Sequence, residues 1–258
     1  MKIVVLVKDV PDTYGERYLN LETGLADREA SEHVIDEIVE RGLEFAISFA
    51  EKNEGTEVIA LAMASEDSST TIRKALAMGA DRAVLVADES LKGADIMLTA
   101  QVLAAALKHV GFDLVVAGDQ STDGAGGVVP AVVAELLNVP QLPRLATIDL
   151  KENAVSGTRV SDRVTLSLHA DLPAIISVSE RFAEPRFPNF KGIMAAKKKP
   201  FDTLSLSDIG AEIDVFAQPR SIMTEITAKP PREAGIKVVA GDTTGQELAD
   251  FLKKNQLA

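Results

Sequence analysis

The chain has 258 residues, of which 46% are hydrophobic and only 4% are aromatic, and its formal net charge is −12. The acidic charge argues against nucleic-acid binding, because contacts with phosphates need a basic surface. The lack of cysteine excludes disulfides, thiolate chemistry and zinc–sulfur sites. The three histidines lie far apart in the sequence, at His33, His109 and His169, so no metal site is expected.

The sequence contains no run near the roughly 18 apolar residues of a membrane-spanning helix. The opening MKIVVLVKDVPD has too short an apolar run for a signal peptide. These features predict a cytoplasmic protein without membrane insertion.

Short apolar runs alternate with amphipathic stretches up to about residue 140. The apolar runs are Ile3–Val7, Val58–Ala62, Ala83–Val86 and Leu114–Ala117. Consecutive Val, Ile and Leu residues are typical of strands that helices cover on both faces of a parallel sheet. Apolar residues at helical spacing predict helices over 31–52, 70–78, 96–109 and 128–137. This βαβα order predicts a doubly wound, mostly parallel α/β sheet of the Rossmann-like, adenine-nucleotide-binding kind.

After Pro140 the pattern changes. Residues 145–150, 154–160 and 163–170 alternate apolar and polar positions, which predicts an antiparallel extension with one solvated face. Pro173–Val178 returns to the buried-strand pattern, and the proline-containing stretch 181–203 is predicted to be an exposed, irregular arm. The tail has little periodicity before a predicted helix at 245–255. It holds too little apolar surface to fold alone, so we expect it to lie on its own domain or on a partner.

The glycine-rich sequence GDQSTDGAGG runs from Gly118 to Gly127, between a predicted buried strand and a predicted helix. Free backbone amides and a helix N-terminus favour an anion there, and glycines let a phosphate approach closely. The loop has neither the lysine of a Walker A motif nor Gly-x-Gly-x-x-Gly spacing. A nucleotide site at the carboxyl edge of the sheet is one interpretation, and a flexible connecting turn is the other.

Candidate catalytic groups are sparse. Asp36, Glu37 and Glu40 are either catalytic carboxylates or a solvated helix face, and the solvated face is the favoured interpretation. Ser121 and Thr122 have no His or Lys nearby in the sequence that would activate a hydroxyl group. We therefore predict a protein that binds a nucleotide and docks other proteins without catalytic groups of its own.

A second feature is the stretch EPRFPNFK, residues 184–191, followed by GIMAAKKK up to Lys199. Phe187 and Phe190 lie there between prolines and beside positive charge. Apolar anchors surrounded by polar groups are typical of a docking loop. The alternative is that both phenylalanines pack onto their own domain and the lysines form a solvated face.

Separated stretches of the chain, taken together, resemble the β subunit of an electron-transfer flavoprotein. They are VLVKDVPD, TIRKALAMGADRAVLV at 71–86, AGDQSTDG and EPRF…GIMAAKKK. The similarity extends from residue 2 to about residue 210 and is weaker in the tail. It implies a heterodimer with an α subunit that holds most of an FAD site, while β holds a structural AMP. It also implies electron flow from flavin-dependent dehydrogenases, such as the acyl-CoA dehydrogenases of fatty acid oxidation, to a quinone oxidoreductase of the respiratory chain.

The resemblance also assigns residues. The AMP positions lie at strand or helix ends on one edge of the predicted sheet: Leu6, Asp36, Glu37, Ile38, Val39, Met63, Gly118, Asp119, Gln120, Ser121, Thr122, Asp123, Gly124, Ala125, Gly126, Gly127, Val128 and Val129. The chain has Asp36-Glu37 where the family often has Asn-Pro, and Gly126 to Val129 where the family often has polar residues. Phosphate contacts are therefore expected mainly from backbone amides and from Ser121 or Thr122.

The partner-binding positions of the family fall on a recognition loop, residues 184–199, and its leucine anchor falls at Phe190. The residues assigned are Glu184, Pro185, Arg186, Phe187, Phe190, Lys191, Lys197, Lys198 and Lys199. Near the flavin, a tyrosine position falls at Thr13, with Tyr14 adjacent, and an arginine position falls at Arg159. The implied organisation is a nucleotide-binding domain over 1–210 and a C-terminal arm over 211–258 that packs on the α subunit.

Two alternatives stay open. One is a β subunit that holds a second FAD in place of AMP, in a complex that splits electron pairs. The other is a standalone nucleotide hydrolase or synthetase of related fold, which the lack of a Walker lysine or an activated nucleophile disfavours.

Overall fold

A computed structural model describes residues 1–210, 213, 219–232, 234–235 and 237–257. The chain forms two compact units, Met1–Thr224 and Glu225–Ala258. The second unit contains one helix in its described part, α6 (Thr244–Lys254), on which Leu248 and Phe251 are exposed. The predicted C-terminal arm, 211–258, lies partly outside the described residues, and the predicted division at 210/211 stays a prediction.

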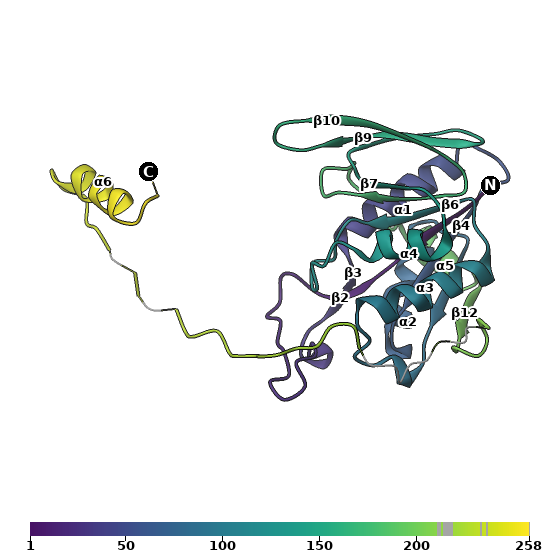
Figure 1. Cartoon of the computed structure of the whole chain (residues 1–258), viewed down its shortest axis with the longest axis horizontal. Coiled ribbons are helices and arrows are strands. Elements are labelled where there is room, and N and C mark those ends of the chain that lie inside the picture. The colour runs from purple at the N-terminus through teal and green to yellow at the C-terminus, as the bar shows by residue number, and fades with distance from the viewer. Residues whose placement is uncertain (211–212, 214–218, 233, 236, 258) are drawn as a thin grey trace. The chain divides into compact units, whose positions relative to one another are not determined.

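A seven-stranded sheet forms the centre of the first unit (Figure 1), and each neighbouring pair of its strands is parallel. Its strand order is β12-β5-β4-β1-β6-β11-β7. The strands are β1 (Lys2–Leu6), β4 (Glu57–Met63), β5 (Arg82–Val86), β6 (Leu114–Gly118), β7 (Gln141–Leu145), β11 (Ala174–Val178) and β12 (Phe201–Leu204). From β1 the chain first builds outward through β4 and β5, and it then returns to place β6 on the other side of β1. This reversal is the topological switch point at which doubly wound sheets bind ligands.

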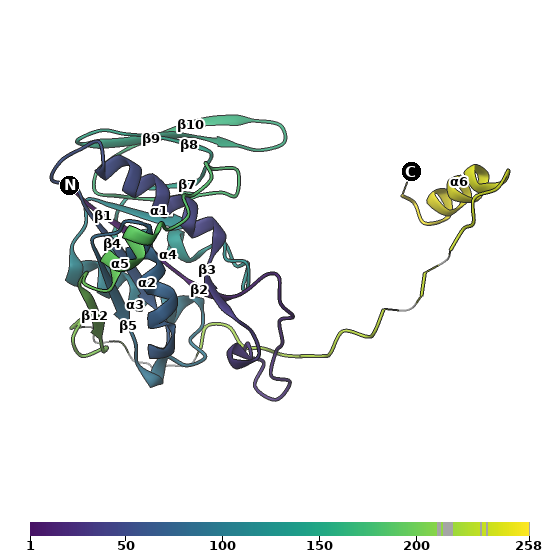
Figure 2. The ribbon, with the colours of Figure 1, turned by 180° about the vertical axis from the view of Figure 1, so that it is seen from behind.

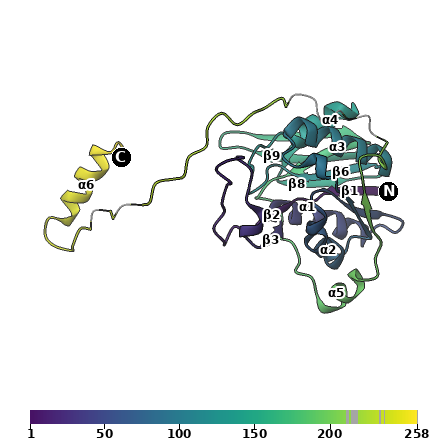
Figure 3. The same cartoon turned by 90° about the horizontal axis from the view of Figure 1, so that it is seen from below.

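Helices cover both faces of this sheet, as Figure 3 shows. On one face lie α1 (Glu37–Ala50) and α2 (Ser69–Met78), and on the other lie α3 (Ile96–Val110) and α4 (Val129–Leu137). Alternate strand residues point to opposite sides, so that Ile3 and Val5 pack with α1 while Val4 packs with α3. Burial on both faces explains why the strands read as continuous apolar runs. The predicted doubly wound α/β fold is confirmed.

The antiparallel extension is also confirmed. It consists of β8 (Thr147–Leu150), β9 (Ala154–Val160) and β10 (Thr165–Asp171) in the order β10-β9-β8. Gly157 permits the close approach of two of these strands, because a Cβ there would lie 2.2 Å from the Thr147 carbonyl oxygen. A small antiparallel pair, β2 (Asp9–Pro11) and β3 (His33–Ile35), follows β1, and short 3₁₀ turns occupy Arg28–Ala30, Glu66–Ser68 and Glu89–Leu91.

The structure differs from the sequence prediction at three places. The helix predicted over 31–52 begins only at Glu37, because residues 33–35 pair with β2 as β3. The stretch 181–203, predicted to be irregular, contains α5 (Phe190–Ala196) and the first residues of β12. Figure 2 shows α5 beside α2 and β12 at the edge of the sheet. Strand β7 was not predicted, since Pro143 and Arg144 interrupt its apolar pattern.

Candidate functional site

The carboxyl ends of β1 and β6 carry the segments that the sequence singled out. The glycine-rich loop leaves β6 at Gly118, and the first turn of α1 packs directly on that residue. A Cβ at Gly118 would lie 3.2 Å from Val39 Cγ2 and 3.3 Å from Ile38 Cγ2. Leu6 ends β1 in the same edge, and Met63 ends β4 beside it. The structure thus brings the four predicted AMP-contacting segments to one edge of the sheet, at the switch point.

Asp36 joins the first turn of α1 to the loop. Its Oδ1 accepts a hydrogen bond from the Ile38 amide at 3.1 Å, which caps the helix, and its Oδ2 accepts two hydrogen bonds from Thr122. The residue is completely buried, so the interpretation of a solvated helix face is wrong for Asp36. Glu40 is also engaged, in an ion pair with Lys74 at 2.5 Å, whereas Glu37 is exposed.

Polar side chains in the first half of the loop are bound within the chain. Lys8 Nζ lies 3.0 Å from Ser121 Oγ and 2.6 Å from Asp123 Oδ1, and Arg28 lies 3.6 Å from Asp123 Oδ2. Burial raises the pKa of Asp123, but the hydrogen bond and charge of Lys8 outweigh it and hold the pKa below its usual value. Arg17 donates to the Thr122 carbonyl at 2.6 Å. This half of the loop is therefore held by contacts within the chain.

The second half of the loop presents backbone instead. Gly126, Gly127 and Val128 are exposed, and no described carbonyl accepts a hydrogen bond from the amides of residues 126–129. Val128 is the N-cap of α4 and supplies no side-chain cap. Gly127 has a φ of +65°, a conformation that favours glycine. Consecutive free amides at a helix N-terminus attract an anion, so this arrangement fits a phosphate group.

Asp119, one of the predicted AMP positions, is a buried carboxylate at the same edge. Asp119 Oδ1 lacks a hydrogen-bond partner among the described residues, and its Oδ2 lies 3.2 Å from Arg144 Nε. Burial raises the pKa of Asp119, and the charge of Arg144 only partly offsets this. Arg144 lies on β7 with a φ of +58°. Arg144 was not predicted, because nothing in its local pattern indicates a partner just beyond the end of β6.

The residues predicted to lie near a flavin are spread over separate elements. Thr13 Oγ1 donates to Glu37 at 3.1 Å, which places Thr13 beside the start of α1, and Tyr14 is 98% exposed. Arg159 lies on β9 opposite Leu166 of β10. Within the described part of the chain, no hydrogen bond or ion pair joins Arg159 to Thr13 or Tyr14. The structure thus places Thr13 beside the start of α1 and Arg159 on the antiparallel sheet.

The recognition loop presents its two phenylalanines to solvent. Phe187 is 91% exposed and Phe190 is 79% exposed, so neither packs onto its own domain. Glu184, Lys191, Lys197 and Lys198 are also exposed, and Pro185 is half-buried. Lys199 differs, because its ammonium group donates to the carbonyls of Leu76, Gly79 and Ala80 at the end of α2. Arg186 likewise makes its contacts within the chain.

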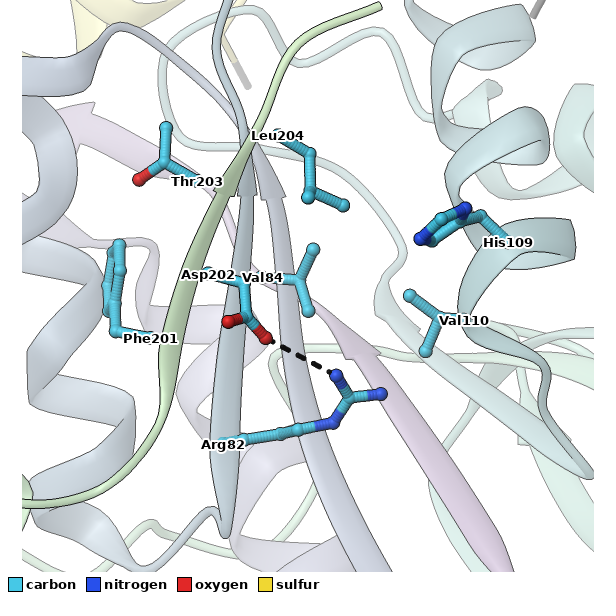
Figure 4. A pocket seen from close by; sticks show the side chains of 8 residues that line it. All are labelled: Arg82, Val84, His109, Val110, Phe201, Asp202, Thr203 and Leu204. Carbon is cyan, nitrogen blue, oxygen red and sulfur yellow. Dashed lines mark hydrogen bonds and ion pairs between the residues drawn. The ribbon is translucent and has the colours of Figure 1, made fainter. Parts of the chain in front are cut away.

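A cavity of about 440 Å³ lies between β5, β12 and the end of α3 (Figure 4). It is lined by Arg82, Val84, His109, Val110, Phe201, Asp202, Thr203 and Leu204. It shares no residue with the loop edge described above. Among the described residues, no cluster of three or more His, Asp or Glu side chains is arranged to hold a metal ion. None of the described helices has the length and apolar character needed to cross a bilayer.

The fold defines a doubly wound α/β protein with a glycine-rich loop at the topological switch point. Residues 23–209 match the family described as electron transfer flavoprotein domain. The chain is 45% identical over 257 residues, or 97% of each chain, to the electron transfer flavoprotein subunit beta of Mycobacterium leprae. It is 32% identical over 256 residues, or 98% of each chain, to that of Bacillus subtilis. It is also 30% identical over 258 residues, or 98% of this chain and 97% of the relative, to the caffeyl-CoA reductase–Etf complex subunit CarD of Acetobacterium woodii. The chain therefore belongs to the electron transfer flavoprotein β-subunit family, and the resemblance inferred from the sequence is confirmed.

Proposed function

We propose that the chain is the β subunit of a heterodimeric electron-transfer flavoprotein of the cytoplasm. It pairs with an α subunit that holds most of the FAD, accepts electrons from flavin-dependent dehydrogenases of the acyl-CoA type, and passes them to a quinone oxidoreductase. The observation that carries this proposal is the 45% identity over 97% of both chains to a β subunit. FAD supplies the redox chemistry when bound, and the protein supplies binding and orientation. In this proposal the chain is an electron carrier and not a standalone enzyme.

We also propose that the loop edge holds a structural AMP. The amides of residues 126–129 would bind the phosphate, because they are free and lie at the start of α4. Ser121, Thr122 and Asp123 would support the loop, since their side chains already bind Lys8 and Asp36. Ile38 and Val39, which pack on Gly118, would form the apolar wall beside the ligand.

Partner contacts follow from the exposed elements. In this proposal Phe187 and Phe190 dock the dehydrogenase, while Lys191, Lys197 and Lys198 supply positive charge around them. The C-terminal arm, 211–258, packs on the α subunit through the apolar face of α6, which carries the exposed Leu248 and Phe251. Thr13, Tyr14 and Arg159 lie toward the flavin.

A second candidate function is a β subunit that holds another FAD in place of AMP. The relative named as a subunit of a caffeyl-CoA reductase–Etf complex, which matches nearly the whole chain, favours this possibility. The same edge would bind the additional cofactor, because the free amides fit any phosphate.

The test is to co-purify the chain with its α subunit, denature the complex and quantify the released nucleotides. We expect about one FAD and about one AMP per heterodimer. About two FAD and no AMP would favour the second candidate. A chain that assembles with no α subunit and releases no nucleotide would overturn both.

A further inference from the structure

Arg186, near the start of the recognition loop, is bound to α1 and to Glu51, the C-cap residue of α1. Its Nε and Nη2 donate to the two carboxylate oxygens of Glu44, at 2.8 and 3.0 Å. Its Nη1 and Nη2 donate to the two oxygens of Glu51, at 2.6 and 2.9 Å. Nη2 also lies 3.2 Å from Ser48 Oγ, and the Arg186 backbone amide donates to Glu44 at 3.0 Å. Glu44 and Ser48 lie on α1, and Glu51 is its C-cap residue with a helical backbone, so their spacing of four and three residues puts all three on one face.

This arrangement occupies every nitrogen of the guanidinium group. Paired hydrogen bonds between arginine and carboxylate fix geometry as well as charge. Burial raises the pKa of Glu44, but its bonds from Arg186 and Ser48 outweigh this and lower the pKa. The hydrogen bond from Arg186 likewise lowers the pKa of the more exposed Glu51. Both carboxylates therefore stay ionised at neutral pH, and all three guanidinium nitrogens are bonded within the chain, with one N–H of Nη1 left over.

The residues that follow Arg186 are the exposed ones. Phe187 comes directly after it, and Phe190 begins α5. On the far side, Asn189 caps α5 through the Gly192 amide at 2.8 Å. Gly192 lies so close to α2 that a Cβ would come within 2.3 Å of the Ala77 carbonyl oxygen. The two phenylalanines therefore lie between the arginine contacts on α1 and the packing of α5 on α2.

We propose that Arg186 is a positioning residue for partner docking, which clamps the recognition loop to α1 so that Phe187 and Phe190 are held in place before the partner binds. This inference rests on the proposed docking function of the loop. A segment that is ordered in the free protein loses less conformational entropy on association, so the clamp favours binding without contacting the partner. In this proposal Arg186 does not contact the partner directly, unlike the other residues assigned to the recognition loop.

The experiment compares two ways of breaking the clamp in the complete heterodimer. Arg186→Gln removes the cation from the loop, and Glu44→Gln/Glu51→Gln removes the anions from α1 without changing the loop. We expect either variant to raise the KM for the heterodimer about three- to tenfold in reduction by a flavin-dependent acyl-CoA dehydrogenase, with kcat unchanged. Hydrogen exchange of the amides at 184–196 should accelerate in both, and combining the changes should add little, because both break the same contacts. Arg186→Lys keeps the positive charge but lacks the planar guanidinium group that bonds two carboxylate oxygens at once, so it should give an intermediate KM.

Several results would overturn the inference, and they differ from failure of the proposed function. If Arg186→Gln raises KM and Glu44→Gln/Glu51→Gln does not, Arg186 contacts the partner directly. If neither variant changes KM while Phe190→Ala does, the loop docks but the clamp does not position it. If Phe190→Ala also leaves KM unchanged, the docking function itself is wrong, and the positioning role falls with it. Should Arg186→Gln fail to assemble, Arg186→Lys and the single variant Glu51→Gln give the same comparison.

Discussion

Asp36 accepts hydrogen bonds from both the backbone amide and the hydroxyl group of Thr122, at 2.7 and 3.0 Å, across a separation of 86 residues. The same carboxylate caps α1 through the Ile38 amide. The first turn of α1 and the glycine-rich loop are therefore one hydrogen-bonded unit. At the centre of this unit lies the buried carboxylate of Asp36, and a buried carboxylate without hydrogen-bond partners would destabilise the fold.

Asp36→Ala should destabilise the protein by about 2–4 kcal/mol, because it removes a helix cap and leaves the Thr122 donors without an acceptor. Urea unfolding of the purified complex measures this. Glu37→Ala is the matched control on the same helical turn and should change stability by less than about 0.5 kcal/mol, since Glu37 is exposed. Equal effects of the two substitutions would show that Asp36 has no special role.

Gly127→Ala should lower the AMP content of the purified heterodimer. The φ of +65° at Gly127 would cost an alanine roughly 1–2 kcal/mol, and relief of that strain would turn the neighbouring amides away from the phosphate. The control is Gly124→Ala in the same loop, where an added Cβ meets only ordinary contacts, 3.5 Å from Ser121 Oγ. Full AMP retention by Gly127→Ala would argue against phosphate binding at these amides.

Phe190→Ala should weaken coupling to the dehydrogenase by about 1–3 kcal/mol, the range expected for an apolar anchor that becomes buried in an interface. The measurement is the dependence of the electron-transfer rate on heterodimer concentration. Phe190→Leu keeps an apolar side chain and restores the residue expected from the family, so it should stay close to the unmodified protein. If alanine and leucine behave alike, Phe190 is not an anchor.

Asp123→Asn should lower the free energy of unfolding at neutral pH by about 1–2 kcal/mol. It should also make that free energy fall less steeply as the pH is lowered. The pKa of Asp123 in the folded protein lies below its usual value, so its contribution is present above the unfolded pKa and is lost as the pH falls through the folded pKa. Melting temperatures between about pH 3 and about pH 7 test this. Asp149→Asn is the control, because Asp149 lies in an exposed ion pair with Lys151. Parallel profiles for Asp123→Asn and the unmodified protein would contradict the assignment.

Asp95→Ala should expose the chain at Arg220 to trypsin. One oxygen of Asp95 caps α3 through Leu98 at 2.8 Å, and the other accepts from the amides of Arg220 and Ser221 at 2.6 and 3.2 Å. Loss of these bonds should accelerate cleavage after Arg220. Asp88→Ala removes a comparable capping bond, to Ser90, elsewhere on the surface and should not accelerate it. An unchanged cleavage rate in Asp95→Ala would show that Asp95 does not hold this segment.

The sequence was sufficient for most of the sheet because the buried strands are continuous apolar runs. β1, β4, β5, β6 and β11 all fall on predicted runs. The edge strands β7 and β12 could not be predicted in the same way. Each has only one neighbour in the sheet and is partly exposed, so Pro143, Arg144 and Asp202 are tolerated there. β3 was hidden because His33–Ile35 leads into the apolar pattern of α1 without a break.

At the candidate site, the sequence indicated the loop and its edge of the sheet but not the contacts within it. Glycines between a strand and a helix are a local pattern, and that pattern can be read directly. The burial of Asp36 and the pairing of Asp119 with Arg144 depend on residues brought together by the fold. For the same reason, the sequence pattern alone does not distinguish hydrogen bonds from Arg186 to Glu44 and Glu51 from contacts with a partner.

The strand order shows that the recognition loop is also part of a connection between two distant strands of the sheet. β11 and β12 are separated in the sheet by β6, β1, β4 and β5, a crossing of roughly 24 Å at about 4.8 Å per strand spacing. Residues 179–200 are the connection that makes this crossing, over the side that α1 and α2 cover. The loop that we propose docks a partner is thus also part of the connection between two strands of the central sheet. Substitutions at exposed positions such as Phe187 and Phe190 would change the surface of this connection without changing how it joins β11 to β12.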